Sequence, residues 1–538
     1  MESHNLRKRK VGKAFLLSSI AVLTSSVLAG CSSESLAKVE VGVYPNSAAS
    51  NAKISEEFAS LASDLTESAF SYFKEIALIP RQSGHLEEIS AYIKKFAIDH
   101  GYPISEDEAG NFAFDVPASG DEYKDYKKII LQAHLDMVVA SSPDISFDPV
   151  KDHIVLCEDE ESFHSDGTTN IGADDGEGLA TLLSIASSSS CAHGPLRFLF
   201  TADEDIGLVG ASKMDASLLD SDYLINVDGS NVGQIIYAAA GALLGEFKAE
   251  AEMEPLPSGY SFVDVEVKGL KGGHSSLHAS SKLLGATTVM KSVLKEVDSS
   301  VTSWRLSSLN GGEFTNAIPN SASLLLAVPS EKKSSAISSI DSAWSTLKKE
   351  YPEETGAAFS CLEVASSADV FSSEQSKKIY ALLDALPDGM VDSQEDSQTS
   401  SNVSPVKIGE GKIELSSLYR SLKNSNLSQM KTDFSSFASQ NGFSFEIGTD
   451  FPAWEQDKDD PFINLFYDGL KSACHLEGVK SKCAGGLETS LFAQKKPGMK
   501  MLSIGADVVG EHVLGEKLYK KSFPAHMAAI LSVLKNNH

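Results

Sequence analysis

Ile171-Gly172-Ala173-Asp174-Asp175-Gly176-Glu177-Gly178 places two adjacent aspartates between glycines, just before an apolar run that starts at Leu179. Glycine allows a sharp turn and a close approach of the main chain to a ligand. The apolar run has helical spacing, so the two acids lie at a helix N-terminus. Acids there can simply complement the helix dipole. Whether they do more depends on where the other acids and histidines fall.

Three further apolar runs predict strands that end in polar residues. The runs cover residues 128–133, 196–200 and 223–227, and they are followed by His134-Leu135-Asp136, Asp203-Glu204-Asp205 and Asp228. Strands that alternate with helices indicate a largely parallel sheet. Ligands bind beyond the carboxyl ends of the strands in such sheets. We therefore expect these acids and the histidine to converge at one edge of the sheet.

The N-terminus has the pattern of a targeting segment. Basic residues between Arg7 and Lys13 precede an apolar run over residues 14–27, which ends in Leu28-Ala29-Gly30-Cys31. The apolar run is too short for a convincing membrane span. Small residues before a cysteine resemble a bacterial lipoprotein signal, cleaved before Cys31 and lipidated on its thiol. An ordinary secretory signal is the alternative. We expect a cell-envelope protein, lipid-anchored on the extracytoplasmic side.

Composition excludes some classes of partner and site. The formal net charge is −28, and nucleic-acid binding requires a basic field. If Cys31 carries lipid, five of the six cysteines remain, and no Cys-x-x-Cys occurs among them. Neither a disulfide framework nor a thiolate zinc site is therefore expected.

At this point the sequence resembles the M20 family of metallopeptidases, and within it the aminoacyl-histidine (Xaa-His) dipeptidase branch. The resemblance covers almost all of the mature chain. Its motifs are Ile79-Pro80-Arg81, His134-Leu135-Asp136-Met137-Val138, Gly172–Gly176, Asp203–Leu208, Asn226-Val227-Asp228, Gly272-Gly273-His274-Ser275, Asn316–Pro319, Gly486-Leu487-Glu488 and His512. Each motif alone is weak, but the ordered set is specific.

The resemblance implies a centre of two divalent metal ions. A shared carboxylate can bridge two metals about 3.5–4 Å apart. By the resemblance Asp174 is that bridge, and the remaining ligands are His134 and Asp228 for one metal and Asp205 and His512 for the other. Zinc is expected, although cobalt or manganese also suits nitrogen and oxygen ligands.

The resemblance also assigns roles around the metals. Asp136 fixes the tautomer of His134, and Glu204 is the general base that activates a metal-bridging water. His274 stabilises the oxyanion, and in dimers of the family it can come from the neighbouring subunit. The polar end of the substrate would be held by Asn316 and Arg420, because the arginine fork suits a carboxylate. Among the remaining residues, Asp175 is expected to be structural.

The predicted fold class is α/β: a catalytic domain with a largely parallel sheet and helices on both faces, plus an inserted α+β lid domain. The expected division is a signal peptide at 1–30, a tether at 31–52, the catalytic domain at 53–238 and 450–538, and a lid and dimerisation domain at 239–449. Within these we expect helices near 56–73, 86–100 (capped by Ser83), 283–297, 338–348 and 461–474. We also expect strands near 112–116, 263–267, 322–328, 406–414, 443–447 and 499–504, and a polar loop at 390–399.

Three departures from the family pattern bear on function. Asp205 stands where glutamate is usual, and Val513-Leu514-Gly515-Glu516 replaces the usual Ser/Thr-Pro turn after His512. Cys483-Ala484-Gly485-Gly486-Leu487-Glu488 replaces a His-Ala-Gly-Leu-Glu segment, which weakens the expectation of an Xaa-His substrate. We expect a dizinc dipeptidase for dipeptides or short peptides. The alternatives are another M20-type amidohydrolase (a tripeptidase or an N-acyl-amino-acid hydrolase) and a non-catalytic surface binding lipoprotein.

Overall fold

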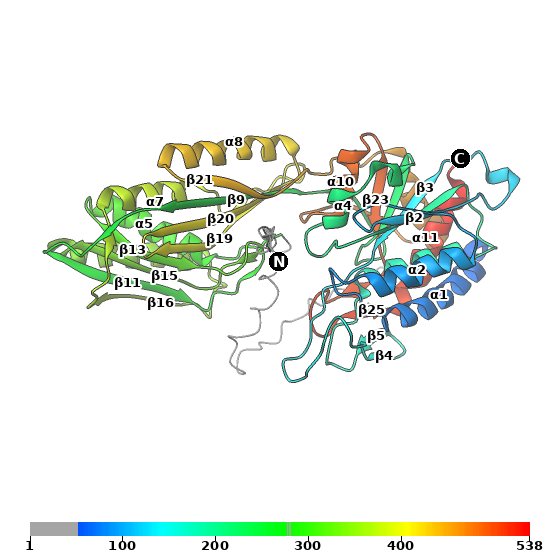
Figure 1. Ribbon diagram of the computed structural model, residues 1–538, viewed down its shortest axis with the longest axis horizontal. Helices are drawn as coiled ribbons and strands as arrows, with labels where there is room; N and C mark the ends of the chain where they lie inside the picture. Colours follow the sequence, from blue (N-terminus) through cyan, green and yellow to red (C-terminus); the bar gives the residue numbers. More distant parts are fainter. Residues whose placement is uncertain (1–51, 277, 279–280) are drawn as a thin grey trace, which may run out of the picture.

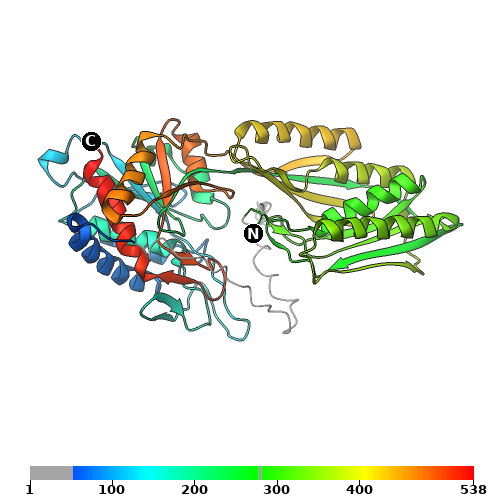
Figure 2. The same ribbon diagram turned by 180° about the vertical axis from the view of Figure 1, so that it is seen from behind.

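The computed structural model describes residues 52–276, 278 and 281–538, which form two lobes set side by side along the long axis of the molecule (Figure 1). Figure 2 shows the same two lobes from behind. The chain passes from one sheet to another between Ala239 and Gly241, and it returns after Phe451. These crossings lie beside the predicted boundaries, and we call the lobes the catalytic domain and the lid. The predicted signal peptide and Cys31 lie outside the described residues.

The catalytic domain contains an eight-stranded sheet with a parallel centre. Strand β3 pairs in parallel with β6 and β7, and β7 pairs in parallel with β23. Antiparallel pairs occur toward the edges, at β1–β2 and β2–β6. The prediction of a largely parallel sheet is therefore confirmed. In order across the sheet, the strands are β1 (Ile104–Glu106), β2 (Phe112–Val116), β6 (Leu196–Thr201), β3 (Ile129–His134), β7 (Tyr223–Val227), β23 (Lys500–Ile504), β8 (Gln234–Ala239) and β22 (Val479–Cys483).

Helices cover both faces of this sheet, because the apolar residues of its central strands alternate between two cores. On β3, Ile129 and Leu131 belong to the larger core, and Ile130 belongs to the smaller. The larger core is packed by α1 (Glu56–Ile76), α2 (Glu87–Asp99), α3 (Ala173–Ser187), α9 (Pro461–Cys474) and α11 (Phe523–Asn536). The smaller core is covered by α4 (Val209–Lys213) and α10 (Glu488–Lys495).

A small four-stranded sheet lies beside α1 and α3 in the catalytic domain. Its strands, in order, are β24 (Val508–Val509), β25 (Lys517–Tyr519), β5 (Ser162–Ser165) and β4 (Leu156–Glu158). Because β24 and β25 pair with each other, the loop between them, which carries His512, is held at both ends. Short 3-10 turns complete the domain at Asp121–Tyr123, Ala216–Leu219 and Lys520–Ser522.

The lid contains a nine-stranded antiparallel sheet whose core is packed by four helices. Its strands are β16 (Ala358–Val364), β11 (Tyr260–Lys268), β15 (Ala322–Pro329), β13 (Arg305–Gly311), β19 (Thr399–Gly409), β20 (Lys412–Ser421), β9 (Gly241–Glu250) and β21 (Ser444–Phe451), with β18 (Gly389–Asp392) beside β19. The helices are α5 (Ala286–Ser300), α6 (Lys333–Glu350), preceded by a 3-10 turn at Ser330–Lys332, α7 (Ser373–Ala385) and α8 (Asn424–Asn441). Two short ribbons pair β10 (Met253–Glu254) with β17 (Val370–Phe371), and β12 (Gly273–His274) with β14 (Ala317–Ile318).

Three local predictions were wrong. The strand expected at 406–414 is two strands, because Glu410 and Gly411 turn the chain between β19 and β20. The polar loop expected at 390–399 contains part of β18 and the first residue of β19. Ser83 does not cap α2, since its hydroxyl donates instead to Asp136 at 2.7 Å.

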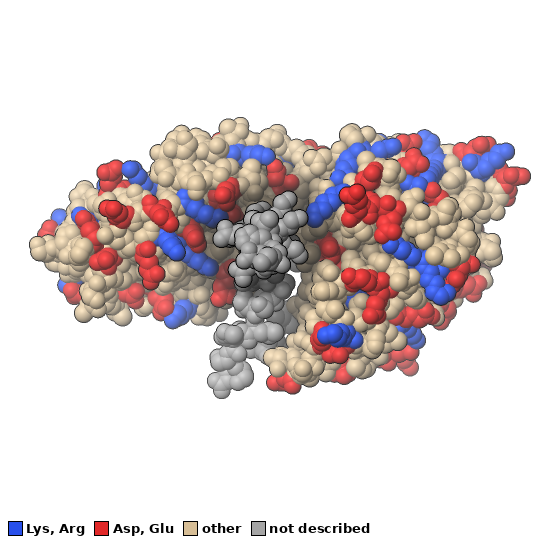
Figure 3. Space-filling view, viewed as in Figure 1, with Lys and Arg blue, Asp and Glu red and all other residues tan. Residues whose placement is uncertain are grey.

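Three further features are the charged side chains on the surface, the cysteines and the apolar character of the helices. Figure 3 shows acidic and basic side chains interspersed over the face that it displays. The five cysteines within the described ranges are all free thiols. Among the helices of the described residues, none combines the length and the apolar character needed to cross a bilayer.

Candidate metal centre

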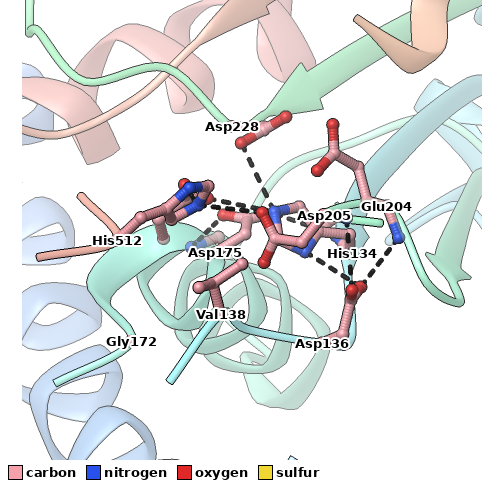
Figure 4. A network of polar contacts seen from close by, with 12 residues as sticks. His134, Asp136, Val138, Gly172, Asp175, Glu204, Asp205, Asp228 and His512 are labelled. Carbon is pink, nitrogen blue, oxygen red and sulfur yellow. Dashed lines mark hydrogen bonds and ion pairs between the residues drawn. The ribbon is translucent and has the colours of Figure 1, made fainter. Parts of the chain in front are cut away.

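The five side chains predicted as metal ligands converge at the carboxyl edge of the catalytic sheet, and Figure 4 labels four of them, His134, Asp205, Asp228 and His512. They reach this place from five separate parts of the chain. His134 ends β3, Asp174 lies in the first turn of α3, Asp205 follows β6, Asp228 follows β7, and His512 lies between β24 and β25. His134, Asp205 and Asp228 lie at strand ends of one sheet edge, where the sequence predicted them, and Asp174 and His512 join them there from α3 and from the loop between β24 and β25.

Asp174 stands between the two histidines. Its Oδ1 lies 3.0 Å from Nε2 of His134, and its Oδ2 lies 3.0 Å from Nε2 of His512. Each oxygen of one carboxylate therefore faces a different imidazole. A carboxylate shared between two metal ions needs this arrangement.

The other two acids complete a group of donor atoms around each histidine. Nε2 of His134 lies 3.7 Å from Oδ1 of Asp228, and Nε2 of His512 lies 2.9 Å from Oδ1 of Asp205. Donor atoms about 2.0–2.2 Å from one zinc ion at tetrahedral angles stand roughly 3.3–3.6 Å apart. The donor types fit two divalent cations that share Asp174, and the four distances of 2.9–3.7 Å lie within about 0.4 Å of that range.

The electrostatics of the cluster favour cations as well. Burial raises the pKa of Glu204 and of Asp228 well above the ordinary range, and neighbouring acids add to the effect. Burial would also raise the pKa of Asp174, but hydrogen bonds from His134 and His512 outweigh it and lower that pKa. Within the described part of the chain, Oδ2 of Asp205 is buried and lacks a hydrogen-bond partner. Such a concentration of buried acids is costly without a compensating positive charge.

Asp175 has a structural place, although its carboxylate lies close to His134 and Asp228. Its Oδ2 accepts a hydrogen bond from the main-chain N–H of His134 at 2.9 Å, and its Oδ1 accepts one from Gly178 at 3.1 Å. Both oxygens are thus engaged by the main chain. The peptide bond between Asp174 and Asp175 is cis.

Glu204 and Asp136 lie next to the ligands. The carboxylate of Glu204 lies within 4.8 Å of donor atoms on His134 and Asp205. Oδ1 of Asp136 lies 3.4 Å from Nδ1 of His134, which is longer than an ordinary hydrogen bond. Asp136 is completely buried and does not face the donor cluster, consistent with a role in orienting His134 rather than in holding a metal.

The lid residues predicted to contact substrate gather around Ser275. Arg420, on β20, donates from Nη1 to Oγ of Ser275 at 2.9 Å, and the main-chain carbonyl of Asn316 accepts from the N–H of Ser275 at 2.8 Å. His274 precedes Ser275 on β12, and its Nδ1 lies 2.9 Å from Oγ of Ser276. Burial lowers the pKa of His274 to about 4, and the positive charges of Arg420 and His512 contribute. The charge of His512 is thus among those that act on His274 of this same chain.

The altered segment that begins at Cys483 lies where the two domains meet. A methyl group added to Gly485 would stand 3.6 Å from Oγ of Ser276 in the lid. Burial raises the pKa of the Cys483 thiol, while the nearby charge of Arg420 opposes that shift. The substitution of cysteine for the usual histidine thus falls beside the groups predicted to hold substrate.

A buried polar network beneath the site was not foreseen from the sequence. Oε2 of Glu488 accepts hydrogen bonds from Gln132 and Thr201, each at 2.7 Å, and Gln132 accepts another from Asn226 at 2.8 Å. The network ties β3, β6 and β7 to the start of α10. The sequence shows these residues only as polar positions within apolar strands. Their pairing could not be predicted, because the hydrogen-bond partners are far apart along the chain.

Comparisons with known proteins agree with this geometry. No protein-family model matches the chain. It is 30% identical over 472 residues to the cytosol non-specific dipeptidase of Escherichia coli strain K12, covering 86% of this chain and 96% of the relative. Aminoacylhistidine dipeptidase from Vibrio alginolyticus superposes with a TM-score of 0.78 at 29% identity, over 87% of this chain and 96% of that one.

A more distant structure shares the fold alone. The M20 family metallo-carboxypeptidase Sso-CP2 from Sulfolobus solfataricus has a TM-score of 0.50 at 12% identity, covering 88% of this chain and 99% of that one. The near-complete match to the Escherichia coli dipeptidase, taken with the fold and the convergent histidines and acids, shows the family. The chain belongs to the M20 family of metallopeptidases, with close similarity to its Xaa-His dipeptidases.

Proposed function

We propose that the protein is a two-metal dipeptidase that hydrolyses dipeptides or other short peptides. The observation that carries the proposal is Asp174, whose two oxygens face His134 and His512 at 3.0 Å each. The dipeptidase names of the Escherichia coli and Vibrio alginolyticus relatives support the same activity.

Each metal position has its own set of protein ligands. His134, Asp174 and Asp228 would hold one ion, and Asp174, Asp205 and His512 would hold the other. Two such ions polarise a scissile carbonyl and lower the pKa of the attacking water. The nitrogen and oxygen donors suit Zn²⁺ best and also accept Co²⁺ or Mn²⁺. Metal analysis of the purified protein tests this assignment.

The residues of the chain then move the proton and orient the groups. Glu204 lies among the donor atoms and takes the proton from the attacking water as general base, then passes it to the leaving amine. Asp136 faces Nδ1 of His134 and would hold the ring so that Nε2 is directed toward Asp174.

The lid supplies the groups that hold substrate. With a pKa of about 4, His274 is neutral near neutral pH and can donate an N–H to the oxyanion that forms on the carbonyl. Arg420 is already oriented by Ser275 and suits the terminal carboxylate of a short peptide. Asn316 would add a polar contact. Movement of the lid against the catalytic domain would close the site around the substrate.

A substrate panel with metal control tests the activity. The soluble protein lacking residues 1–31 is assayed on dipeptides that include Xaa-His and β-Ala-His, on tripeptides and on N-acyl amino acids, with zinc and with a chelator. We expect dipeptide cleavage that the chelator abolishes. Preferential cleavage of tripeptides or N-acyl amino acids would assign another amidohydrolase activity. Absence of all cleavage by metal-loaded protein would refute the peptidase and favour a binding lipoprotein.

Attachment to the membrane is a separate proposal, supported by the residues before Cys31. The basic residues, the apolar run and Leu28-Ala29-Gly30-Cys31 together favour a lipoprotein held on the extracytoplasmic side. Mass spectrometry of the mature N-terminus should find a diacylglyceryl group on Cys31, and Cys31→Ser should release the protein from the membrane fraction. An unmodified Cys31 in the mature protein would exclude the anchor.

Self-association through the lid is likewise proposed from the family resemblance. Light scattering on the purified protein should give the mass of a dimer. A monomer with full activity would show that His274 acts within its own chain.

A further inference from the structure

The main-chain peptide groups of Gly172 are held from both sides by the buried side chains of an arginine and a glutamate. The N–H of Gly172 donates to Oε2 of Glu516 at 2.8 Å, and its carbonyl accepts a hydrogen bond from Nη2 of Arg81. Arg81 and Glu516 are each only 1% exposed. We call Arg81, Gly172 and Glu516 the Gly172 clamp. Gly172 lies two residues before Asp174, the residue that faces both histidines.

Glu516 engages three main-chain N–H groups around the Asp174 turn. Oε2 accepts from Ile171 as well as from Gly172, both at 2.8 Å, and Oε1 accepts from Asp174 at 3.2 Å. Hydrogen bonds to a carboxylate are stronger than those between neutral groups. Because Glu516 lies in the same loop as His512, its carboxylate joins the His512 loop to the main chain that carries Asp174.

Arg81 joins the same turn to the end of β3. Its Nη1 donates to the carbonyls of Leu135 and Asp136, at 3.2 and 2.5 Å, while Nη2 donates to Gly172. The guanidinium thus bridges the segment after His134 and the segment before Asp174. Every acceptor that it reaches among the described residues is a main-chain carbonyl, so these hydrogen bonds tie it to the main chain rather than to a carboxylate.

Glycine is required at the centre of this arrangement. Gly172 has φ +61°, and a methyl group there would lie 2.6 Å from Nη2 of Arg81 and 2.6 Å from Sδ of Met137. The guanidinium could not approach the carbonyl of any larger residue in this way. The glycine that the sequence places before the two aspartates therefore admits the clamp as well as the turn.

The buried side chains of Arg81 and Glu516 partly compensate each other electrostatically. A single buried charge without a partner is costly. Burial lowers the pKa of Arg81, and the charges of Asp175, Asp136 and Glu516 oppose that shift. Removing either member of the clamp would leave the other with only part of its compensation.

We propose that Arg81 and Glu516 are positioning residues, which hold Asp174 in register with His134 and His512 and so set the affinity of the site for its metals. The inference rests on the proposed two-metal function, and it adds two residues that touch no ligand side chain. They act through the main chain, by fixing three ligand-bearing segments to one another.

The test compares Glu516→Gln with Glu354→Gln. Glu354 is a buried glutamate of the lid that also accepts two main-chain hydrogen bonds, from Lys271 at 2.8 Å and Leu284 at 3.4 Å. Zn²⁺ affinity is measured by competition with a chromophoric chelator, and the stability of the metal-free protein by urea unfolding. Loss of partners around a metal ligand typically costs 10–100-fold in affinity. We expect that loss for Glu516→Gln, and an affinity within twofold of wild type for Glu354→Gln.

Conservative variants keep the proposal testable if Glu516→Gln does not fold. Glu516→Asp retains the carboxylate and should fall between Glu516→Gln and wild type in metal affinity. Arg81→Lys keeps the charge but loses the two-pronged geometry, so it should also weaken Zn²⁺ binding. In the double variant Arg81→Lys/Glu516→Gln, the combined loss should be smaller than the product of the single losses, because both act on one turn.

Two results would overturn the proposal. One is Zn²⁺ affinity within twofold of wild type in folded Glu516→Gln protein or, where that variant does not fold, in both Glu516→Asp and Arg81→Lys protein. The other is an equal loss of affinity in Glu516→Gln and Glu354→Gln, which would indicate general destabilisation. Both outcomes concern metal binding, so they are separate from failure of the proposed function, in which wild-type protein binds metal and cleaves no peptide.

Discussion

The main-chain N–H of Glu204 donates a 2.9 Å hydrogen bond to Oδ1 of Asp136. The other oxygen of Asp136 accepts from the hydroxyl of Ser83 at 2.7 Å and from the N–H of Asp205 at 3.2 Å. Since Nδ1 of His134 lies 3.4 Å from Oδ1, one buried carboxylate faces the histidine that we propose as a metal ligand and fixes the main chain of Glu204, the proposed general base. In the proposed mechanism, Asp136 would therefore couple the first metal position to proton transfer.

Asp136→Asn should weaken both metal binding at His134 and proton transfer by Glu204. The amide has only one acceptor oxygen, so its NH₂ group would face the N–H of either Glu204 or Asp205. We expect kcat/KM and Zn²⁺ affinity each to fall about 10–100-fold. Steady-state kinetics and chelator competition check this, with Ser83→Ala as the milder variant. If Asp136→Asn changed neither quantity by more than twofold, its assigned role would be wrong.

Glu204→Gln should separate proton transfer from metal binding. The amide keeps the shape of the side chain but cannot accept a proton, and general-base catalysis contributes about 10²–10⁴-fold. We expect kcat to fall by that factor while Zn²⁺ binding stays within a few-fold of wild type. Glu67→Gln, on the exposed face of α1, is the control. More than a tenth of wild-type kcat in Glu204→Gln would exclude it as the base.

The catalytic domain was predictable because its elements carry strong local signals. The interval 461–474 predicted for a helix is the interval of α9, where Asp460 caps the first turn by accepting from the N–H of Phe462 and Pro461 occupies the first helical position. Strand β7 likewise coincides with the apolar run at 223–227 that predicted it. The acids at strand ends then converge because parallel strands share a carboxyl edge.

The lid hairpin and the clamp could not be predicted in this way. Strand β19 starts with polar residues, and its buried hydroxyls pair with β20, as Thr399 and Ser421 do at 2.8 Å. The three N–H groups held by Glu516 are more than 300 positions away in the chain, at Ile171, Gly172 and Asp174. Periodicity reports local burial, whereas these contacts depend on where distant segments meet.

Arg420→Lys should raise KM for substrates with a free C-terminal carboxylate. Nε of Arg420 is buried and, among the described residues, has no hydrogen-bond partner, while Nη1 is fixed by Ser275. A hydrogen bond to a charged group contributes about 1.5–3 kcal/mol, so KM should rise roughly 10–100-fold with little change in kcat. Dipeptide amides lack the carboxylate and provide the control. An equal rise in KM for acids and amides would contradict carboxylate recognition.

Asp115→Asn should remove stability only at pH values where the carboxylate is ionised. Arg197 donates to both oxygens of Asp115, at 2.9 and 2.8 Å, and Lys128 lies 3.0 Å away. Burial alone would raise the pKa of Asp115, but these partners outweigh it and lower that pKa.

A lowered folded-state pKa means that the stabilisation is complete above the unfolded value of about 3.9. It is lost as the pH falls through the folded value. Because Asp115 is half exposed, we expect only about 1 kcal/mol at pH 7. Urea unfolding should show this difference between wild type and Asp115→Asn shrinking below about pH 4. If the difference in the free energy of unfolding between the two proteins grew at low pH, it would contradict a lowered folded-state pKa of Asp115.

Gly505→Ala should displace Asp228 by forcing apart the ends of β7 and β23. The N–H groups of Asp228 and Gly229 both donate to the carbonyl of Ile504, at 3.0 and 2.8 Å. This brings the two backbones so close that a methyl group on Gly505 would lie 1.6 Å from the carbonyl oxygen of Gly229. Main-chain atoms cannot give way as the end of a flexible side chain can.

We therefore expect Gly505→Ala to destabilise the metal-free protein by about 3 kcal/mol or more, as severe overpacking does, and to weaken Zn²⁺ binding. Gly285→Ala is the matched control, because a methyl group there would meet its nearest neighbour at 3.6 Å. Its stability should stay within about 1 kcal/mol of wild type. If both variants unfolded at the same urea concentration and bound Zn²⁺ alike, close backbone approach would not be what positions Asp228.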